Sequence, residues 1–207
     1  MALRLYAATT SEGKSRDFRV AALAHSLAIE PLPGLKNIPT PDENGATFES
    51  NAALKALYYS RFALGELIIS DDSGLEVDAL HGEPGVRSAR FAADTGLVDS
   101  PDANDNTDVW NNMVLLQRLA GVPPEKRTAR YRCALVVARD GEPLFAAEGA
   151  VEGLIFDAPR GTGGFGYDPL FYLPTLGLTM AELDLETKLS LSHRGRALRA
   201  LLKKMDV

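Results

Sequence analysis

The sequence predicts a fold of the α/β or α+β class, organised as one large domain or as two closely joined lobes. Stretches typical of strands alternate with stretches typical of helices, and no repeat, low-complexity tract or long linker divides the chain. The 207 residues are 45% hydrophobic and 24% charged. A chain of this length and composition can bury a proper core, so its stability does not require a metal ion or disulfides.

The N-terminal third predicts one strand and two helices. Residues 3–8 form an opening apolar strand, and the turn after it leads into a helix over about residues 15–27. Four prolines between residues 31 and 41 impose an extended or looped segment. Thr47 then caps a second helix that continues to about Leu64, because a threonine side chain can accept a hydrogen bond from a free N–H group of the first turn.

The middle of the chain predicts two extended pieces, a loop and a helix. Residues 67–70 form a short apolar strand that ends at two aspartates, and residues 75–80 form another extended piece. Residues 94–108 are rich in Asp, Asn and Ser and predict a surface loop. A helix through residues 110–119 follows, with Gly121 as its stop.

The C-terminal third predicts a hairpin, a glycine-dense loop and a final helix. Residues 128–139 and 144–155 flank an Asp-Gly turn, which is a strong signal for an antiparallel hairpin. Residues 161–168 form the glycine-dense loop. A capping-box pattern begins at Thr179, and an amphipathic helix of about ten residues starts near Ser192.

Composition excludes several classes of protein. A formal net charge of −6 argues against a protein that coats DNA or RNA, since that task favours a broad basic surface. No apolar run is long enough for a signal peptide or a membrane span, so we expect a cytoplasmic protein that binds neither membrane nor nucleic acid. The one cysteine, Cys133, lies in an apolar run and reads as a core residue in a reducing compartment.

The segment Asp71-Asp72-Ser73-Gly74 carries the first candidate chemistry. Two carboxylates at the end of a strand, followed by Ser-Gly, place an acidic group in a turn where a metal or a phosphate can approach the backbone closely. Magnesium favours such a site because it takes only one or two carboxylates and keeps waters and phosphate oxygens. The alternative is a turn in which the Asp side chains only cap the strand.

The turn after the first strand is a candidate anion site. Its hydroxyl groups, its flexible glycine and a lysine at a helix start suit a phosphate. The segment comprises Thr9, Thr10, Ser11, Glu12, Gly13 and Lys14. It lacks the P-loop spacing, and ordinary strand-to-helix turns also contain such residues.

Two further groups lie near the C-terminus. The loop residues Gly161–Gly166 match G-x-G-x-x-G, but they follow a hairpin and open no helix, so we reject a dinucleotide site. Glycines around an exposed Phe165 and Tyr167 would let a flat base approach, unless the loop is simply mobile. Lys188 and Ser192-His193-Arg194 bring cations near a helix start, where self-capping is the alternative role.

Six motifs occur in a distinctive order between residue 3 and about residue 202. They are Thr-x-x-x-Gly-Lys, Thr-Phe-x-x-Asn-Ala-x-x-Lys-Ala, Asp-Asp-Ser-Gly-Leu, Pro-Gly-Val-x-Ser-Ala-Arg, Gly-Phe-Gly-Tyr-Asp-Pro and Ser-His-Arg. This order resembles the inosine/xanthosine triphosphate pyrophosphatase family, also called dITP/XTP diphosphatases. The resemblance implies one ITPase-like domain over residues 1–207, an elongated mixed-sheet α/β fold with two lobes around a nucleotide-binding cleft, and a homodimer. It also implies magnesium-dependent hydrolysis of ITP, dITP and XTP to the monophosphate and pyrophosphate, which cleanses the nucleotide pool.

The resemblance also assigns roles to the matching positions. Asp72 would be the general base and the magnesium-associated carboxylate, while Ser73 and residues 9–14 would contact the phosphates. The base would be framed by Phe165, Gly166, Tyr167 and Asp168. Lys188, His193 and Arg194 would complete the pocket.

One position departs from the family pattern. Many members have a metal-binding glutamate five residues before the helix lysine, where this chain has Ser50, with Glu49 one position earlier. One step along a helix rotates a side chain by about 100°, so Glu49 does not substitute directly. The second protein ligand of the metal is left open by the sequence.

The expected reaction is attack of a water oriented by Asp72 on the α-phosphorus, with Lys14 and Lys188 neutralising the growing charge. Arg194, a permanent donor, is the candidate for recognising a 6-keto oxygen. The other hypotheses are a related pyrophosphatase for modified pyrimidine triphosphates, a nucleotide-binding regulator without catalysis, and, least favoured, a nucleic-acid-binding module.

Overall fold

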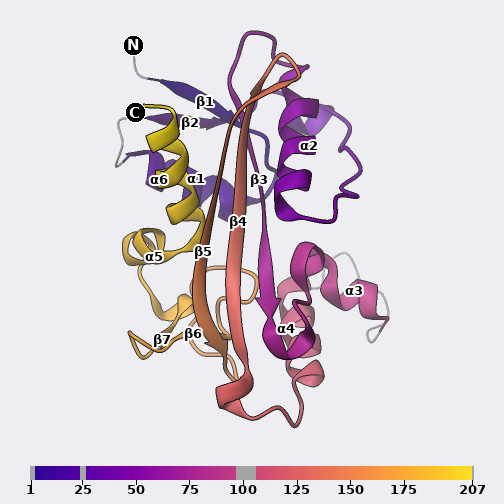
Figure 1. Ribbon diagram of the computed structural model, residues 1–207, viewed down its shortest axis with the longest axis vertical. Helices are drawn as coiled ribbons and strands as arrows, with labels where there is room; N and C mark the ends of the chain where they lie inside the picture. Colours follow the sequence, from indigo (N-terminus) through magenta and orange to yellow (C-terminus); the bar gives the residue numbers. More distant parts are fainter. Residues whose placement is uncertain (1–2, 24–26, 97–105, 207) are drawn as a thin grey trace. The chain divides into compact units, whose positions relative to one another are not determined.

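The structure, a computed structural model, describes residues 3–23, 27–96 and 106–206. The chain combines strands and helices (Figure 1), as predicted for the α/β class; they alternate from β1 to α3, and β4 to β7 then follow one another. Within the described ranges the strands form an open mixed sheet of seven strands in the order β2-β1-β3-β4-β5-β6-β7. β1 pairs in parallel with β2 and β3, whereas β6 pairs antiparallel with β5 and β7.

The elements have the following bounds. The strands are β1 Arg4–Ala7, β2 Ala28–Pro31, β3 Ile68–Val77, β4 Thr128–Arg139, β5 Glu142–Ile155, β6 Phe171–Leu173 and β7 Leu178–Thr179. The α-helices are α1 Glu12–Leu23, α2 Phe48–Ser60, α3 Phe91–Thr95, α4 Thr107–Arg118, α5 Leu185–Leu191 and α6 His193–Lys204. The 3-10 turns are η1 Leu35–Asn37, η2 Asp78–Leu80, η3 Gly85–Arg90, η4 Pro124–Lys126 and η5 Met180–Glu182. None of the helices in the described part of the chain has the length and apolar character that a membrane crossing requires.

The chain divides into two compact units. Unit 1 comprises Met1–Ser73, Arg132–Ala150 and Leu189–Val207, and unit 2 comprises Gly74–Tyr131 and Val151–Lys188. The long strands β3, β4 and β5 pass from one unit into the other, so neither unit is a continuous stretch of sequence.

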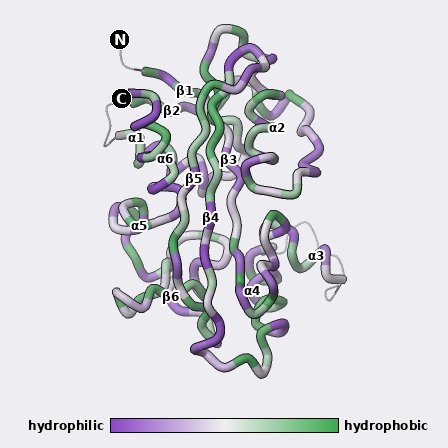
Figure 2. The backbone as a smooth tube through the Cα atoms, viewed as in Figure 1, coloured by the Kyte–Doolittle hydropathy of each residue, from purple (hydrophilic) through white to green (hydrophobic). Residues whose placement is uncertain are grey.

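Each unit has a hydrophobic core of its own. In unit 1, Phe18 of α1 and Leu198 of α6 pack with Leu135 of β4. In unit 2, Leu115 of α4 and Phe171 of β6 belong to the second core. Figure 2 shows β4 hydrophobic over its second half, which is the part that runs through the core of unit 1.

Cys133 of β4 is buried in the same core, as predicted. Burial raises the pKa of its thiol to about 12, so the thiol stays protonated at neutral pH. A protonated, buried thiol is a core residue and not a nucleophile.

Several predicted elements are confirmed with small shifts. The hairpin is present, and its second strand begins at residue 142. Thr47 caps α2, which ends at Ser60, four residues earlier than predicted. The final helix begins at His193 with Ser192 as its cap. α4 begins at Thr107, three residues earlier than predicted. Most of the predicted loop over residues 94–108 lies outside the described residues.

Two predictions about local structure are wrong. The aspartate segment is not a turn between two strands, because β3 runs without interruption from Ile68 to Val77. α1 begins at Glu12 and not near residue 15, so three residues assigned to the turn form its first helical turn. For the aspartate segment, sheet partners that are distant in the sequence set the backbone, and local turn signals do not report those partners. The start of α1 is held locally, because Ser11 Oγ accepts a hydrogen bond from the Lys14 N–H.

Candidate functional site

Asp71 and Asp72 are neighbours in β3, but their side chains have different partners. Successive side chains of a strand point to opposite faces of the sheet. Asp71 is bound by the ammonium group of Lys14 at 3.1 Å and by Nη2 of Arg194 at 3.1 Å. Asp72 instead accepts a hydrogen bond from Nδ2 of Asn51 at 3.1 Å. The two carboxylates therefore belong to two sets of contacts within unit 1.

Arg194 joins two aspartates in the interior of unit 1. Its Nη1 donates to Asp17 Oδ2 at 2.7 Å, and its Nη2 donates to Asp71 Oδ2 and, at 2.9 Å, to Ser73 Oγ. The side chains of Arg194, Asp17 and Asp71 are 3%, 2% and 1% exposed. Charges buried this deeply are tolerated when they are paired and hydrogen-bonded.

The two neighbouring aspartates also differ in acidity. Burial by itself raises the pKa of Asp71, but the positive charges of Lys14 and Arg194 outweigh it, so that pKa lies well below its usual range. Burial also raises the pKa of Asp72, and there Lys55 and Lys14 do not fully compensate, so that pKa stays above its usual value. Asp71 is therefore a permanent anion that holds cations. Asp72 is the carboxylate better suited to accept a proton.

Glu43, which the sequence analysis did not single out, approaches Asp72 through Lys55. The Lys55 ammonium lies 2.6 Å from Oε2 of Glu43 and 3.5 Å from Oδ1 of Asp72. Glu43 lies in the irregular segment between η1 and α2, so no helical or strand periodicity aligns it with the aspartates. The one feature of the sequence that could have indicated Glu43 is its position four residues before Thr47, because Thr47 caps the helix that carries Lys55.

The start of α2 accounts for the unusual residue at position 50. The Thr47 N–H donates to Ser50 Oγ at 3.1 Å, and the Ser50 N–H donates to Thr47 Oγ1 at 3.1 Å, which forms a capping box. Glu49 is exposed in the first turn, where a negative charge suits the helix dipole. Ser50 therefore caps the helix, and the second carboxylate near Asp72 comes from Glu43.

The predicted anion-binding segment forms the entry to α1. Thr9 Oγ1 accepts a hydrogen bond from the Ser11 N–H at 3.2 Å, and Ser11 Oγ accepts one from the Lys14 N–H at 3.4 Å. Thr10 and Glu12 are exposed, whereas Lys14 is half-buried and reaches Asp71. N–H groups at the first turn of a helix favour anions, so this segment retains the character of a phosphate site.

In unit 2, the loop over residues 161–168 is tied to α5. Asp168 Oδ2 accepts hydrogen bonds from the Phe165 N–H at 2.9 Å and from Lys188 Nζ at 2.5 Å. The Lys188 ammonium also lies 5.2 Å from the centre of the Phe165 ring, within range of a cation–π interaction. The structure thus brings together three residues that the sequence analysis selected from two separate motifs.

Tyr167 does not have the exposure that the sequence analysis expected. Its ring is buried in the core of unit 2, and its hydroxyl donates to the main-chain oxygen of Ser88 at 2.8 Å. The expectation of an exposed Tyr167 is wrong because apolar neighbours that are distant in the sequence cover the ring. Tyr167 therefore anchors the loop, and Phe165, which is only partly buried, is the ring that a flat ligand could reach.

The start of α6 combines both roles that the sequence left open. Ser192 caps the helix by accepting a hydrogen bond from the Gly195 N–H at 3.2 Å. His193 is buried in unit 1, and Arg194 belongs to the buried aspartate cluster. The motif is therefore a helix cap as well as the source of a buried cation.

The formal charges of the ion pairs in unit 1 indicate whether these residues could hold the expected magnesium ion. These ion pairs contain one carboxylate more than cations: the carboxylates are Asp17, Glu43, Asp71 and Asp72, and the cations are Lys14, Lys55 and Arg194. No group of three or more His, Cys, Asp or Glu that could hold a metal occurs among the described residues. Magnesium needs only one or two carboxylates, together with waters and phosphate oxygens. Asp72 and Glu43, which share one ammonium group, fit that requirement.

Comparison with known proteins identifies the relatives of this chain. Residues 5–204 match the Ham1 family. A dITP/XTP pyrophosphatase from Acidobacterium capsulatum is 57% identical over 205 residues, with 99% of each chain covered. A dITP/XTP pyrophosphatase from Geobacillus kaustophilus is 47% identical, covering 94% of this chain and 90% of the relative.

Solved structures agree with these relatives. A Ham1 protein from Coxiella burnetii superposes with a TM-score of 0.81 at 31% identity, covering 99% of this chain and 98% of its own. The Ham1 protein of Staphylococcus aureus gives a TM-score of 0.78 at 36% identity, with 98% of each chain covered. The matches in sequence and in structure confirm the resemblance drawn from the six motifs, and the chain belongs to the Ham1 family.

Proposed function

We propose that this chain hydrolyses ITP, dITP and XTP to the corresponding monophosphate and pyrophosphate. Relatives that are similar over nearly the whole chain carry the name dITP/XTP pyrophosphatase. The observation in this chain that carries the proposal is the pair Asp71 and Asp72. One carboxylate, Asp71, holds Lys14 and Arg194 in place, and the other, Asp72, lies beside Asn51 and Lys55.

The phosphates bind in unit 1 in this proposal. The first turn of α1 supplies N–H groups and hydroxyls, and Lys14 supplies a positive charge. Ser73 adds a hydroxyl that Arg194 orients at 2.9 Å. Donors held in place before the substrate arrives need no reorganisation when charge develops, which is the main source of rate in such sites.

Magnesium is the proposed cofactor, and Asp72 and Glu43 are its proposed protein ligands. A cluster with an excess of carboxylates repels a triphosphate, and a divalent cation reverses the sign of that charge. When bound, the ion would supply positive charge to the phosphate oxygens. Lys55, which now lies between the two carboxylates, would remain as a nearby cation.

The proposed reaction transfers one proton and exchanges one bond. Asp72 orients a water molecule and accepts its proton while the oxygen attacks the α-phosphorus. The bond between the α-phosphorus and the oxygen that bridges to the β-phosphorus breaks, and pyrophosphate leaves with that oxygen. Lys14 lies among the donors that neutralise the growing charge.

The base is the part of the substrate that we assign to unit 2. Phe165 offers a ring, and the Asp168–Lys188 pair offers polar atoms beside it. A purine can stack on such a ring while its edge is read by hydrogen bonds. Polar groups left unpaired by the wrong base discriminate strongly.

The test is pyrophosphate release from ITP, dITP, XTP, GTP and ATP, each with and without magnesium. Asp72→Asn protein prepared in parallel serves as the blank. We expect selective, magnesium-dependent release from the first three substrates. Tight binding of ITP without release would replace the enzyme with a nucleotide-binding regulator, and preference for modified pyrimidine triphosphates in a wider panel would change the substrate class.

A further inference from the structure

Two side chains of α4 bind the main chain of one residue of the glycine-rich loop, Gly166. The Gly166 N–H donates to Asp108 Oδ2 at 2.6 Å. The Gly166 carbonyl oxygen accepts a hydrogen bond from Asn112 Nδ2 at 2.8 Å. Asp108 and Asn112 are four residues apart and therefore share one face of the helix. Both polar main-chain groups of Gly166 are thus held by one helix of unit 2.

The orientation of Asn112 is itself constrained. Its Nδ2 also donates to the main-chain oxygen of Asp108 at 2.7 Å, so the amide makes two bonds to carbonyl oxygens. An amide nitrogen has two protons to donate and both are used, which leaves one consistent orientation for the side chain. We call Asp108 and Asn112 the α4 clamp on Gly166. The helix, and not the loop, fixes the orientation of the Asn112 side chain in this clamp.

The helix that carries the clamp is firmly seated. Asn111 Oδ1 accepts from the Ala92 N–H at 2.8 Å, and Asn111 Nδ2 donates to the Ala89 oxygen at 3.2 Å. Val114 and Leu115 lie in the core of unit 2. A side chain on a packed helix places a ligand-binding loop more accurately than the loop could place itself.

Gly166 is a position where such a clamp has a strong effect. Its φ is +64°, a conformation that favours glycine, and its two sequence neighbours are Phe165 and Tyr167. Tyr167 is anchored to Ser88 on one side of Gly166. The two hydrogen bonds fix the peptide groups on both sides of Gly166. They therefore also fix the direction in which the Phe165 side chain points away from the main chain.

We propose that Asp108 and Asn112 are positioning residues that set the discrimination between purine bases. This inference rests on the proposed function, since it assigns the loop to the base. Telling a 6-keto purine from a 6-amino purine requires polar groups placed to within a fraction of an ångström. The α4 clamp supplies that placement to Phe165 and to the Asp168–Lys188 pair.

The test compares kcat/KM for ITP with kcat/KM for ATP and GTP in Asp108→Ala, Asn112→Ala and wild-type protein. A charge-assisted hydrogen bond contributes about 1.5–3 kcal/mol, so we expect the ITP preference to fall by about tenfold or more in Asp108→Ala. Asp108→Asn keeps an oxygen acceptor without the charge and should lie between Asp108→Ala and wild type. If Asp108→Ala does not fold, Asp108→Asn and Asn112→Ala carry the test.

Asn106→Ala is the matched control. Asn106 caps α4 by accepting a hydrogen bond from the Asp108 N–H at 3.1 Å, and neither hydrogen bond to Gly166 described above comes from Asn106. Its loss should lower the melting temperature and leave the ITP preference unchanged. If the two side chains only stabilise the structure, their loss should lower kcat/KM by the same factor for ITP, ATP and GTP. Such an equal loss for all substrates, in Asp108→Ala and in Asn112→Ala, would overturn the proposal.

The failure of this proposal can be told apart from the failure of the proposed function. If the wild-type protein releases no pyrophosphate from any substrate, the proposed function fails. Calorimetric titration with ITP and with ATP then still compares the affinities in wild type and in Asn112→Ala. An unchanged ratio of the two dissociation constants would overturn the clamp on its own.

Discussion

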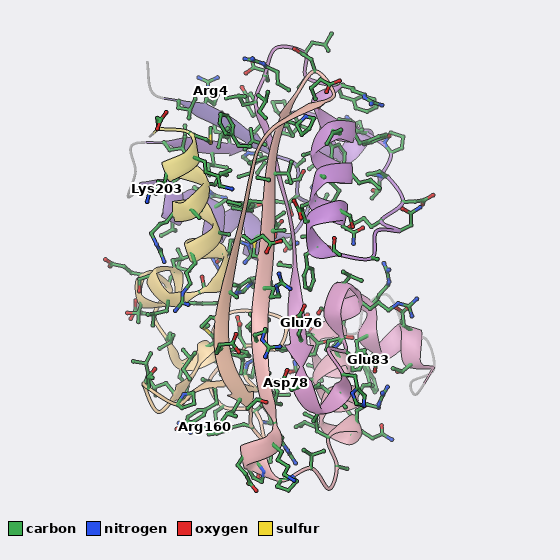
Figure 3. All side chains as sticks on the ribbon, viewed as in Figure 1. Arg4, Glu76, Asp78, Glu83, Arg160 and Lys203 are labelled. Atoms are coloured by element: carbon green, nitrogen blue, oxygen red, sulfur yellow. The ribbon has the colours of Figure 1, made fainter. Side chains whose placement is uncertain are left out.

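The same pair of groups, a guanidinium and carboxylates, occurs in two very different settings in this molecule. In unit 1, Arg194 is bound to Asp17 and Asp71, and all three side chains are at most 3% exposed. In unit 2, Arg130 of β4 is bound to Asp78 at 3.0 Å and to Glu152 at 3.2 Å, with side chains 30%, 45% and 69% exposed. Asp78 and its neighbour Glu76 are labelled in Figure 3.

The difference in burial separates ion pairs that can serve binding from ion pairs that lie on the surface and contribute little. Burying charge carries a desolvation penalty of several kcal/mol per ion, which a pair repays only with good geometry and further hydrogen bonds. An exposed pair has little penalty and little gain. The burial of Arg194 beside Asp71 is therefore easier to explain if that cluster has a function. The exposed ion pairs of Arg130 require no such explanation.

The largest expected effect comes from Asp72, the proposed proton acceptor. Asp72→Asn keeps the size and the hydrogen-bonding ability of the side chain but removes the base. We expect kcat for ITP to fall by about 10²- to 10⁴-fold, with a melting temperature close to that of wild type. Pyrophosphate release and a thermal melt check the two parts, and normal turnover would remove Asp72 from its proposed role.

Removing the buried guanidinium is expected to affect stability most. Arg194→Ala strands Asp17 and Asp71 in the interior without their shared partner, and breaking a buried pair in this way costs about 3–5 kcal/mol. Urea denaturation measures the change. The same variant, where it folds, also tests the expectation from the sequence that Arg194 recognises the 6-keto oxygen. An unchanged ITP to ATP preference would contradict that expectation.

The metal assignment gives an intermediate effect. Glu43→Gln should raise the magnesium concentration needed for half-maximal activity by about tenfold or more, because one anionic ligand is lost. Glu49→Gln is the matched control, since Glu49 is exposed in the first turn of α2. Equal magnesium curves for wild type and Glu43→Gln would exclude Glu43 as a ligand.

The smallest effect is expected at the exposed network. Arg130→Ala removes contacts with Asp78 and Glu152 that lie in water, so the free energy of unfolding should fall by about 1 kcal/mol or less. Added salt should reduce this difference further, whereas the loss in Arg194→Ala should depend little on salt. A large, salt-independent loss at Arg130 would break the comparison between the two regions.

Much of the fold was predictable because its signals are local. The Asp-Gly turn predicted the β4–β5 hairpin, and Thr47 and Ser192 predicted the starts of α2 and α6. Caps and tight turns are decided by residues within a few positions of one another. Most of the candidate site residues could be proposed from the sequence, because they lie in the six short motifs.

Two of the wrong predictions share one physical cause. The aspartate segment looked like a turn because Asp, Ser and Gly favour turns, but β3 continues through it in a sheet whose other strands come from elsewhere in the chain. Tyr167 looked exposed among glycines, but Ser88, 79 positions away, accepts its hydrogen bond in the core. Contacts at such separations override local preference.

The sequence by itself determined the alternation of elements, the helix caps, the hairpin and the family of this protein. Tertiary structure decided which of two adjacent aspartates is the permanent anion, because only packing sets which one faces Lys14 and Arg194. It also decided that Glu43 approaches Asp72 and that Asp108 and Asn112 hold Gly166. A pKa, a metal site or a clamp depends on distances between groups, and distances between residues far apart in the chain exist only once it has folded.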